Sequence, residues 1–383
     1  MVRGGSGLGR TMGLSPLVVG LTVVAFATSA PEMAVSVGAS LSGAPGLAVG
    51  NVVGSNITNV LLVLGTAAVV LPVAVRSQLV RIDVPVMVMF SALLLVLSLD
   101  GNVSRAEGTV LVVLLLGYVG WSLRNSRTEV PDEWEPEAEQ VPPPAGRGWL
   151  ADVGMVAAGV VMLVVGAHLM VDAATRVAAT VGVSDLIIGL TVVSIGTSLP
   201  EVATAVIAAL RGERELAIGN VVGSCVCNIG LVMGVTAMVA RVGVPVDLAA
   251  VRFDIPVMVA VAAALLPVVF TGFVITRVEA AVFLAYYVVY VAYLLLDAAD
   301  HDALPAFSAT LLWFVIPITV LTWTLLSLHQ FRDRRSDRPA VGSRARRTAR
   351  RVSVVTSGGS GCRVTGAVSP GEQHQSGSDG AGQ

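Results

Sequence analysis

The chain of 383 residues contains no lysine, so its 24 basic side chains are all arginines. A phosphate-binding loop of the Walker type needs a lysine that reaches the nucleotide phosphates. The absence of lysine therefore excludes such a loop and argues against an ATP-driven pump. Cysteine is also scarce. The three cysteines, Cys225, Cys227 and Cys362, give neither a disulfide framework nor a cluster with the spacing of a zinc site.

Charged residues are few, and they lie mainly between long apolar runs. Charged side chains make up 13% of the chain and hydrophobic ones 55%, and the mean hydropathy of +0.81 exceeds that of soluble globular domains. A helix that crosses a bilayer needs about 20 apolar residues. The sequence therefore predicts an all-α, polytopic membrane protein. The expected spans are 14–38, 47–71, 83–99, 107–123, 149–171, 186–210, 216–240, 254–270, 278–296 and 304–328.

One stretch of 46 residues occurs twice. The first copy covers residues 20–65 and the second covers residues 189–234, at a constant offset of 169 residues. No gap is needed, and 26 of the 46 positions are identical. The identities include polar and small residues, which chance similarity between apolar segments would not match. The repeat therefore indicates a duplicated architecture.

The repeat divides the chain into two halves, a linker and a tail. We expect a first half at 1–123, a polar linker rich in proline and glutamate at 124–148, and a second half at 149–296. The further span at 304–328 precedes a tail at 329–383 that is rich in arginine, serine and glycine. We expect this tail to be disordered.

The offset also reveals an unequal number of spans. Met1 aligns with Met170, near the end of the span 149–171, so the first half lacks a counterpart of that helix. Either the start codon has been assigned too far downstream or the protein truly lacks the helix, and we favour the first explanation. No cleavable signal peptide is visible.

The arginines predict the orientation of the spans. If the linker 124–148 is cytoplasmic, 20 arginines lie on the inside and four on the outside, as the positive-inside rule expects. This assignment places the linker and the tail in the cytoplasm of a multi-pass cell-membrane protein. It also gives the two copies of the repeat opposite orientations, so the sequence predicts inverted repeats. The four outside arginines are Arg105, Arg176, Arg241 and Arg252.

Two glutamates lie near the middle of apolar spans, at equivalent places of the repeat. An ionised side chain at a helix centre costs about 2.5–3.5 kcal/mol, and no arginine lies in the apolar runs around Glu32 and Glu201. A bound cation would supply the missing partner. Pro31 and Pro200 directly precede them, and each removes a backbone donor and disfavours helix continuation. We therefore expect each span to consist of two half-helices.

The residues around each break add oxygen atoms to this predicted site. Ser29 and Ser198 fit the N-cap of the second half-helix, with a glutamate three residues later. Carbonyls at 25–28 and 194–197 would be released from the helix, in a membrane where they need a partner. Carbonyl, hydroxyl and carboxylate oxygens together suit a hard cation, Ca²⁺ or Na⁺.

The second part of each repeat carries a polar pair on one helix face. Ser55 and Asn59 are four residues apart, as are Ser224 and Asn228. A purely structural interpretation is tight helix packing beside a capped helix start. The recurrence of both carboxylates and both breaks favours the ion site. Small residues on the same helices leave space for another backbone: Gly50, Gly54, Gly219 and Gly223.

These motifs resemble the sodium/calcium exchangers of the cation/Ca²⁺ antiporter superfamily, in their prokaryotic form. The resemblance is carried by GLTVVAFATSAPE and GNVVGSNITN in the first copy and by GLTVVSIGTSLPE and GNVVGSCVCN in the second. It implies two inverted five-helix halves and alternating access of Na⁺ and Ca²⁺ to a shared site. Relative to that family, the first helix is missing and one C-terminal helix is extra. The ligands implied by position are Glu32 and Glu201 for Ca²⁺, surrounded by Thr28, Ser29, Thr197, Ser198, Ser55, Asn59, Ser224 and Asn228.

Family members can carry aspartate where Asn59 or Asn228 stands. With asparagine at both positions, two carboxylates remain, and their charge suits one Ca²⁺ ion. We therefore expect a secondary antiporter that exchanges Ca²⁺ for Na⁺. The alternative is a Ca²⁺/H⁺ antiporter that uses the same glutamates, although the hydroxyl-rich surroundings favour Na⁺.

Two further classes of protein remain as alternatives. An intramembrane enzyme would need a nucleophile–base pair or a metal triad in the spans, and neither is found. A scaffold that transports nothing would tolerate loss of both glutamates. We expect no cofactor besides the transported Ca²⁺ and Na⁺. The expected surroundings are the lipid bilayer, with no nucleic acid and no obligatory protein partner.

Overall fold

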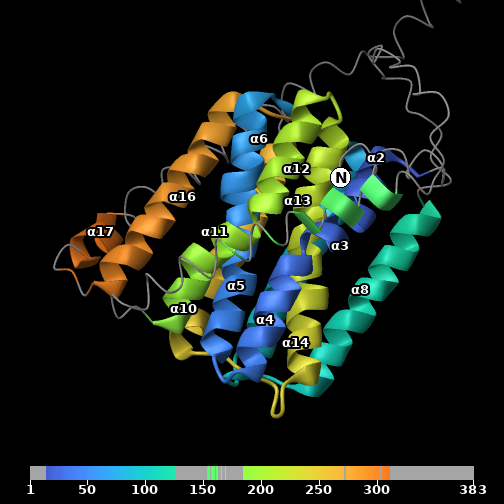
Figure 1. The fold of residues 1–383 in the computed structure, drawn as a ribbon. Helices are drawn as coiled ribbons and strands as arrows, with labels where there is room; N and C mark the ends of the chain where they lie inside the picture. The colour runs from blue at the N-terminus through green and yellow to red at the C-terminus, as the bar shows by residue number, and fades with distance from the viewer. Residues whose placement is uncertain are drawn as a thin grey trace, which may run out of the picture. The chain divides into compact units, whose positions relative to one another are not determined.

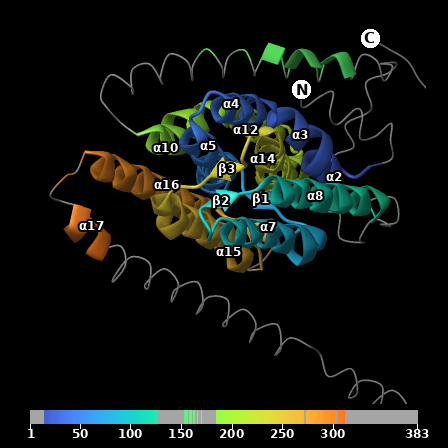
Figure 2. The ribbon, with the colours of Figure 1, turned by 90° about the horizontal axis from the view of Figure 1, so that it is seen from below.

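The computed structural model describes residues 14–125, 184–270, 273–299, 301 and 304–310, with isolated positions between 153 and 169. The predicted tail lies entirely outside the described residues. So do most residues of the predicted linker and of the predicted spans 149–171 and 304–328. The described residues belong to a single compact unit. Figures 1 and 2 show it from two directions.

The described part is built from helices, several of which contain a π-helical segment, labelled η. In the first half these are α2 (Pro16–Val19), η1 (Gly20–Val24), α3 (Ala25–Thr28), α4 (Ala30–Leu41), α5 (Pro45–Thr58), η2 (Asn59–Val63), α6 (Leu64–Val70), η3 (Leu79–Asp83), α7 (Val84–Leu97) and α8 (Arg105–Asn125). In the second half they are α10 (Asp185–Ile188), η4 (Gly189–Val193), α11 (Ser194–Thr197), α12 (Leu199–Leu210), α13 (Arg214–Cys227), η5 (Asn228–Met233), α14 (Gly234–Val239), η6 (Ala250–Asp254), α15 (Ile255–Phe270) and α16 (Arg277–Ala298), followed by α17 (Leu304–Thr310).

Consecutive helical segments join into spans that are long enough to cross a membrane. Seven such helices occur in the described residues, and an eighth span is formed by Pro16–Thr28 and Ala30–Leu41, which meet at a bend of 42°. The all-α, polytopic prediction is confirmed. Seven spans are Pro45–Val70, Leu79–Leu97, Arg105–Asn125, Leu186–Leu210, Arg214–Val239, Ala250–Val269 and Arg277–Ala298.

Two short antiparallel strand pairs join loops of the first half to loops of the second. Strand β1 (Val73–Ala74) pairs with β4 (Val274–Ile275), and β2 (Asn102–Val103) pairs with β3 (Val244–Pro245). The helices α8 and α16, which end the two halves, lie on opposite sides of the central helices (Figures 1 and 2). The chain thus links its two halves at both ends of the bundle.

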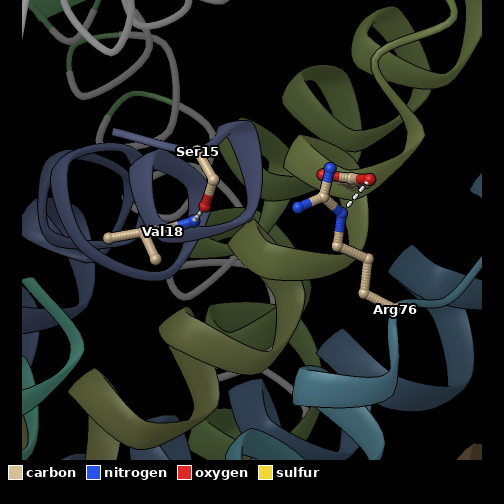
Figure 3. Close-up of polar contacts among 4 residues, drawn as sticks. Ser15, Val18 and Arg76 are labelled. Carbon is tan, nitrogen blue, oxygen red and sulfur yellow. Dashed lines mark hydrogen bonds and ion pairs between the residues drawn. The ribbon is translucent and has the colours of Figure 1, made fainter. Parts of the chain in front are cut away.

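Contacts at the helix ends establish the relative direction of the halves. The loop after α6 carries Arg76, which forms an ion pair with Glu215 in the first turn of α13 (Figure 3). The span Pro45–Val70 therefore ends at the face where its repeat equivalent, Arg214–Val239, begins. The two halves run in opposite directions through the bundle, as the arginine distribution predicts. Figure 3 also shows the start of α2, where Ser15 Oγ accepts a hydrogen bond from the Val18 N–H at 3.4 Å.

Matching hydrogen bonds close the two faces. At one face, Arg277 Nε at the start of α16 donates to the Val69 carbonyl in α6 at 3.1 Å. At the other face, Arg105 Nε at the start of α8 donates to the Ala240 carbonyl just after α14 at 2.7 Å. Each half thus satisfies a carbonyl that the end of a helix in the other half leaves without an intrahelical partner.

The broken span of each half crosses the second span of the other half at very short range. A Cβ atom added at Gly219 would lie 2.6 Å from the Leu17 carbonyl oxygen, and one added at Gly50 would lie 2.5 Å from the Leu186 carbonyl oxygen. Only glycine permits this approach, so the predicted use of glycine as space for another backbone is confirmed. The crossing brings the two copies of the polar motif together in the centre.

Candidate cation site

Both broken spans are interrupted by one residue. Ser29 separates α3 from α4, and Ser198 separates α11 from α12. The predicted interruption is confirmed, but the predicted release of all carbonyls before it is wrong. The backbone N–H groups of Ser29 and Ser198 still donate to the Ala25 and Ser194 carbonyls, at 2.9 and 3.0 Å. The prolines remove only the donors that would reach positions four residues earlier.

The predicted capping role of the two serines is also wrong. An N-cap side chain reaches the next amides from an extended backbone. Ser29 instead has φ −76° and ψ 4°, Ser198 has φ −84° and ψ 1°, and neither side chain forms a capping hydrogen bond. The Oγ atoms of both serines are buried, and neither forms a hydrogen bond in the structure. Their hydroxyls are therefore free to contact a ligand.

The two glutamates are completely buried, with 0% of each residue exposed. Both carboxylate oxygens of Glu32 lack a hydrogen-bond partner of ordinary geometry, although Thr197 and Ser198 lie beside them. In Glu201, Oε1 accepts a hydrogen bond from Ser224 Oγ at 3.3 Å, while Oε2 lacks a partner. The carboxylates are close enough for their charges to interact. Ionised together in a buried site, they need a counter-charge.

Hydroxyl groups join the two halves around these carboxylates. Each threonine that precedes a break binds the asparagine and the serine on the second span of the opposite half, so the contacts obey the same approximate two-fold symmetry as the repeat. The four contacts are Thr28 Oγ1 to Asn220 Oδ1 (3.3 Å), Thr28 Oγ1 to Ser224 Oγ (3.2 Å), Thr197 Oγ1 to Asn51 Oδ1 (3.0 Å) and Thr197 Oγ1 to Ser55 Oγ (3.4 Å).

The last two predicted site residues lie one helical turn beyond the serines. Asn59 and Asn228 begin the π-helical segments η2 and η5, and both are 0% exposed. All four of their side-chain amide atoms lack a hydrogen-bond partner. Buried amides are normally paired. Their position on the helix faces of Ser55 and Ser224 makes their oxygens available to an ion at the crossing.

Sequence reasoning missed Asn51 and Asn220 as members of this site. Both are 0% exposed, and their side-chain oxygens accept the hydrogen bonds of Thr197 and Thr28. The available signal was their position, because Asn51 lies four residues before Ser55 and is identical in both copies of the repeat. These asparagines hold the threonine hydroxyls in place.

The site is not perfectly symmetric. Asn51 Nδ2 donates to Ser36 Oγ at 2.9 Å and to the Glu32 carbonyl at 3.2 Å. At the equivalent of Ser36 the second half has Ala205, and Asn220 Nδ2 has no partner. The asparagine of the first half is therefore fixed at both ends, whereas that of the second half is fixed at one.

The donor set suits hard cations. Among the residues that the structure describes, no group of three or more His, Cys, Asp or Glu side chains is placed to hold a metal ion. The crossing instead offers two carboxylates with hydroxyl, amide and carbonyl oxygens. Such oxygen ligands favour Ca²⁺, Na⁺ and similar ions over soft metals. An ion of this kind would supply the counter-charge that the glutamates lack.

Comparison with known proteins identifies a family. The family model described as sodium/calcium exchanger protein matches residues 1–124 and 152–296. CaxA of Alkalimonas amylolytica is 41% identical over 269 residues, which cover 69% of this chain and 82% of the relative. The sodium/calcium exchanger MaX1 of Methanosarcina acetivorans is 30% identical over 324 residues, which cover 76% of this chain and 91% of the relative.

A solved structure shares the fold. The sodium–calcium exchanger NCX_Mj, soaked with Na⁺ and Sr²⁺, matches with a TM-score of 0.62 and 32% identity, over 76% of this chain and 91% of its own. With both copies of the repeat inside the matched residues, the chain belongs to the sodium/calcium exchanger family of membrane transporters.

Proposed function

We propose that this chain exchanges Ca²⁺ for Na⁺ at the crossing of its two broken spans, with Glu32 and Glu201 as direct ligands. The observation that carries the proposal is a set of buried oxygens without hydrogen-bond partners. They comprise three of the four carboxylate oxygens and the Oγ atoms of Ser29 and Ser198. Because buried polar atoms are nearly always paired, a positively charged ligand fits this place.

Charge balance lets one site serve both ions. Two ionised carboxylates are neutralised by one Ca²⁺ or by two Na⁺ ions. A site with uncompensated charge is costly inside the membrane, so the neutralised site passes most readily through a state that is closed to both faces. Ca²⁺ and Na⁺ therefore compete for the glutamates, and the gradient of one ion drives the other.

The hydroxyl contacts across the crossing couple the ion to both halves. Thr28 and Ser224 lie beside Glu201, and Thr197 and Ser198 lie beside Glu32. An ion that draws these oxygens together therefore pulls on spans from both halves. The sodium/calcium exchangers MaX1 and NCX_Mj, which this chain resembles over most of its length, support the choice of ions.

We also propose that the protein lies in the cell membrane with its linker and tail in the cytoplasm. The support is the distribution of arginine, with 20 on the proposed inner side and four on the outer side. The faces defined by the structure fit this scheme, because Arg76 and Arg277 lie at one face and Arg105 at the other.

The exchange is tested by Ca²⁺ uptake into proteoliposomes that are loaded with Na⁺ and diluted into Na⁺-free buffer at fixed pH. We expect uptake that depends on internal Na⁺ and falls at least tenfold in Glu32→Gln and Glu201→Gln, because each variant removes one charged ligand. The matched control is Glu107→Gln. This variant changes a glutamate in the first turn of α8, outside the site, where glutamine can keep the capping contact with Ser104, and it should transport normally.

The same vesicles separate the proposal from its alternatives. Uptake that ignores Na⁺ but follows an imposed pH gradient would identify the proton-coupled antiporter instead. Equal uptake in the two site variants and in the unchanged protein would show that the glutamates do not bind the transported ion.

A further inference from the structure

The helix α16 carries a row of polar side chains away from the glutamates. Tyr287 and Tyr290 are only 7% and 6% exposed, and Asp297 is exposed near the end of the helix. The two tyrosines are three positions apart (i, i+3), so their rings share one helix face. A buried polar row of this kind needs partners on the neighbouring spans.

The partners lie at both ends of the row. Tyr287 Oη lies 3.3 Å from Thr58 Oγ1, and Thr58 directly precedes Asn59 of the cation site. Tyr290 Oη donates a hydrogen bond to Asp254 Oδ1 at 3.3 Å. Asp254 is 3% exposed and interacts electrostatically with Asp297. The row therefore runs from the neighbourhood of the site to the face at which α16 ends.

The first half contains only the outer part of this arrangement. Tyr118 Oη donates to Asp83 Oδ1 at 2.8 Å. Tyr118 and Tyr290 each lie 13 residues after the arginine that begins their helix, and Asp83 and Asp254 end η3 and η6, so the two pairs are equivalent. Where the second half has Tyr287, the first half has Leu115, which is buried and apolar. The tyrosine–aspartate bond alone thus serves to join two helices in both halves. The connection to the site exists in one half only.

Cysteine replaces the other inner member of the row. The repeat equivalent of Thr58 is Cys227, which is 0% exposed. A thiol is a weak hydrogen-bond donor and acceptor compared with a hydroxyl. With leucine and cysteine in these two places, no hydroxyl chain leads from Asn228 toward Tyr118 in the described residues.

We propose that Thr58, Tyr287, Tyr290 and Asp254 form a proton pathway between the cation site and the face at which α16 ends. Ionisable side chains inside membranes mark proton relays, and a hydroxyl can pass a proton along because it both donates and accepts a hydrogen bond. The inference deepens the proposed function, because it adds protons as competitors for the same site. The inference rests on the proposed function in one respect: it takes the crossing of the two broken spans as the place where the ions bind.

Each transfer conserves protons and charge. Asp254 accepts the proton of Tyr290 Oη, and that phenol takes a replacement proton from Tyr287 Oη. Tyr287 is in turn reprotonated through the Thr58 hydroxyl by a carboxyl group that carries a proton in the cation site. The proposed chain requires one bridging water molecule between the two phenols, which lie three residues apart on one face. Asp254 then releases its proton to solvent near Asp297. The reverse sequence carries a proton inward.

Asp254 is the group of the row that accepts protons, given the side chains around it. In the described part of the chain, the ionisable groups that face it are Tyr290, Tyr293 and Asp297, all on α16. The packed helices α5 and α15 contain no ionisable side chain. Acid at this face therefore loads the pathway with protons and lowers occupancy of the site by Ca²⁺.

The test measures Na⁺-driven Ca²⁺ uptake in right-side-out and inside-out vesicles while the pH of the bath alone is changed. One competing proton alters the apparent Ca²⁺ affinity by up to about tenfold per pH unit. We expect this response in one vesicle orientation only. Tyr287→Phe should abolish it at unchanged ring size, and Asp254→Asn should weaken it.

The first half supplies matched controls. Tyr118→Phe and Asp83→Asn make the same chemical changes at the equivalent pair, which lacks the inner connection, and should keep the full response. An equal response from both faces, or an unchanged response in Tyr287→Phe, would overturn the pathway while leaving exchange intact. Absence of Na⁺-driven uptake at every pH in the unchanged protein would overturn the proposed function and the pathway together.

Discussion

Asn51 forms three hydrogen bonds in the protein interior, whereas its counterpart Asn220 forms one. The side chain of Asn51 binds Thr197, Ser36 and the Glu32 carbonyl, but Asn220 binds Thr28 alone. Removal of the Asn51 side chain would leave several buried groups without a hydrogen-bond partner, and each such group costs free energy. Removal of the Asn220 side chain would leave only one. The two residues are thus chemically equal and structurally unequal.

We predict that Asn51→Ala lowers the free energy of unfolding by about 1–3 kcal/mol more than Asn220→Ala does. Thermal unfolding of the purified protein in detergent measures the difference. Ser36→Ala provides the control, because it gives the first half the alanine that the second half already has. In that background the gap between the two asparagine variants should shrink. Equal losses in the unchanged background would contradict the asymmetry.

At the scale of the helix, close packing at the crossing depends on glycine. A Cβ atom at Gly223 would lie 2.6 Å from the Leu21 carbonyl oxygen and 2.7 Å from Leu21 Cα. These are backbone atoms, so no side chain can rotate away to make room. The spans α13 and η1 would have to separate, and the hydroxyl contacts around Glu201 would lengthen with them.

Gly223→Ala should therefore destabilise the protein by about 1–3 kcal/mol, the usual cost of overpacking, and should reduce Ca²⁺ uptake more than protein yield. Gly117→Ala in α8 is the matched control, because nothing lies within 4 Å of its Cβ position. It should be neutral or stabilise by up to about 1 kcal/mol, as alanine is the better helix former. Unfolding temperature and uptake are measured on both variants. A similar effect of both substitutions would contradict the close crossing.

The repeat made much of this element-level picture predictable. Two interrupted spans and a central site could be predicted from Pro31 and Glu32 together with their counterparts 169 residues later. The wrong details concern local backbone geometry. Ser15, with ψ 151°, caps α2, whereas Ser29, with ψ 4°, caps no helix, and the residue type does not determine ψ.

The buried aspartates show a second limit of sequence reasoning. The predicted spans began at Asp83 and Asp254, where an ionisable residue would lie near the membrane surface. The structure begins these helices four residues earlier, at Leu79 and Ala250, through the π-helical segments η3 and η6. The aspartates are therefore buried against Tyr118 and Tyr290. Their partners lie more than thirty residues away in the sequence, beyond the reach of any local pattern.

In the whole molecule, the two faces of the bundle are closed in similar but unequal ways. Both faces have a strand pair and an arginine bound to a helix-end carbonyl. Only one has the ion pair of Arg76 and Glu215 among the described residues. The equivalent of Arg76, two residues after β1, is Asp247, two residues after β3, and the repeat equivalent of Glu215 is Gly46. Aspartate and glycine cannot form an ion pair. The two faces can therefore open with different ease.

The assignment of the faces can be checked with a cysteine that lies outside the spans. Cys225 and Cys227 are buried, at 1% and 0% exposure, so a membrane-impermeant maleimide should report on Cys362 in the tail. We predict labelling in inside-out vesicles but not in intact cells, because the arginine-rich tail is proposed to be cytoplasmic. Cys362→Ser should remove the signal. Labelling of intact cells would reverse the proposed topology.

The hydrogen bonds across the crossing also constrain how the protein is made. They join residues 146 and 192 positions apart in the chain. A ribosome that adds about 5–20 residues per second needs about 7–40 s to produce the second partner after the first. Throughout that interval Glu32 and Asn51 lack the residues that surround them in the finished protein. The nascent first half therefore carries its buried polar side chains without their partners for longer than any other part of the site.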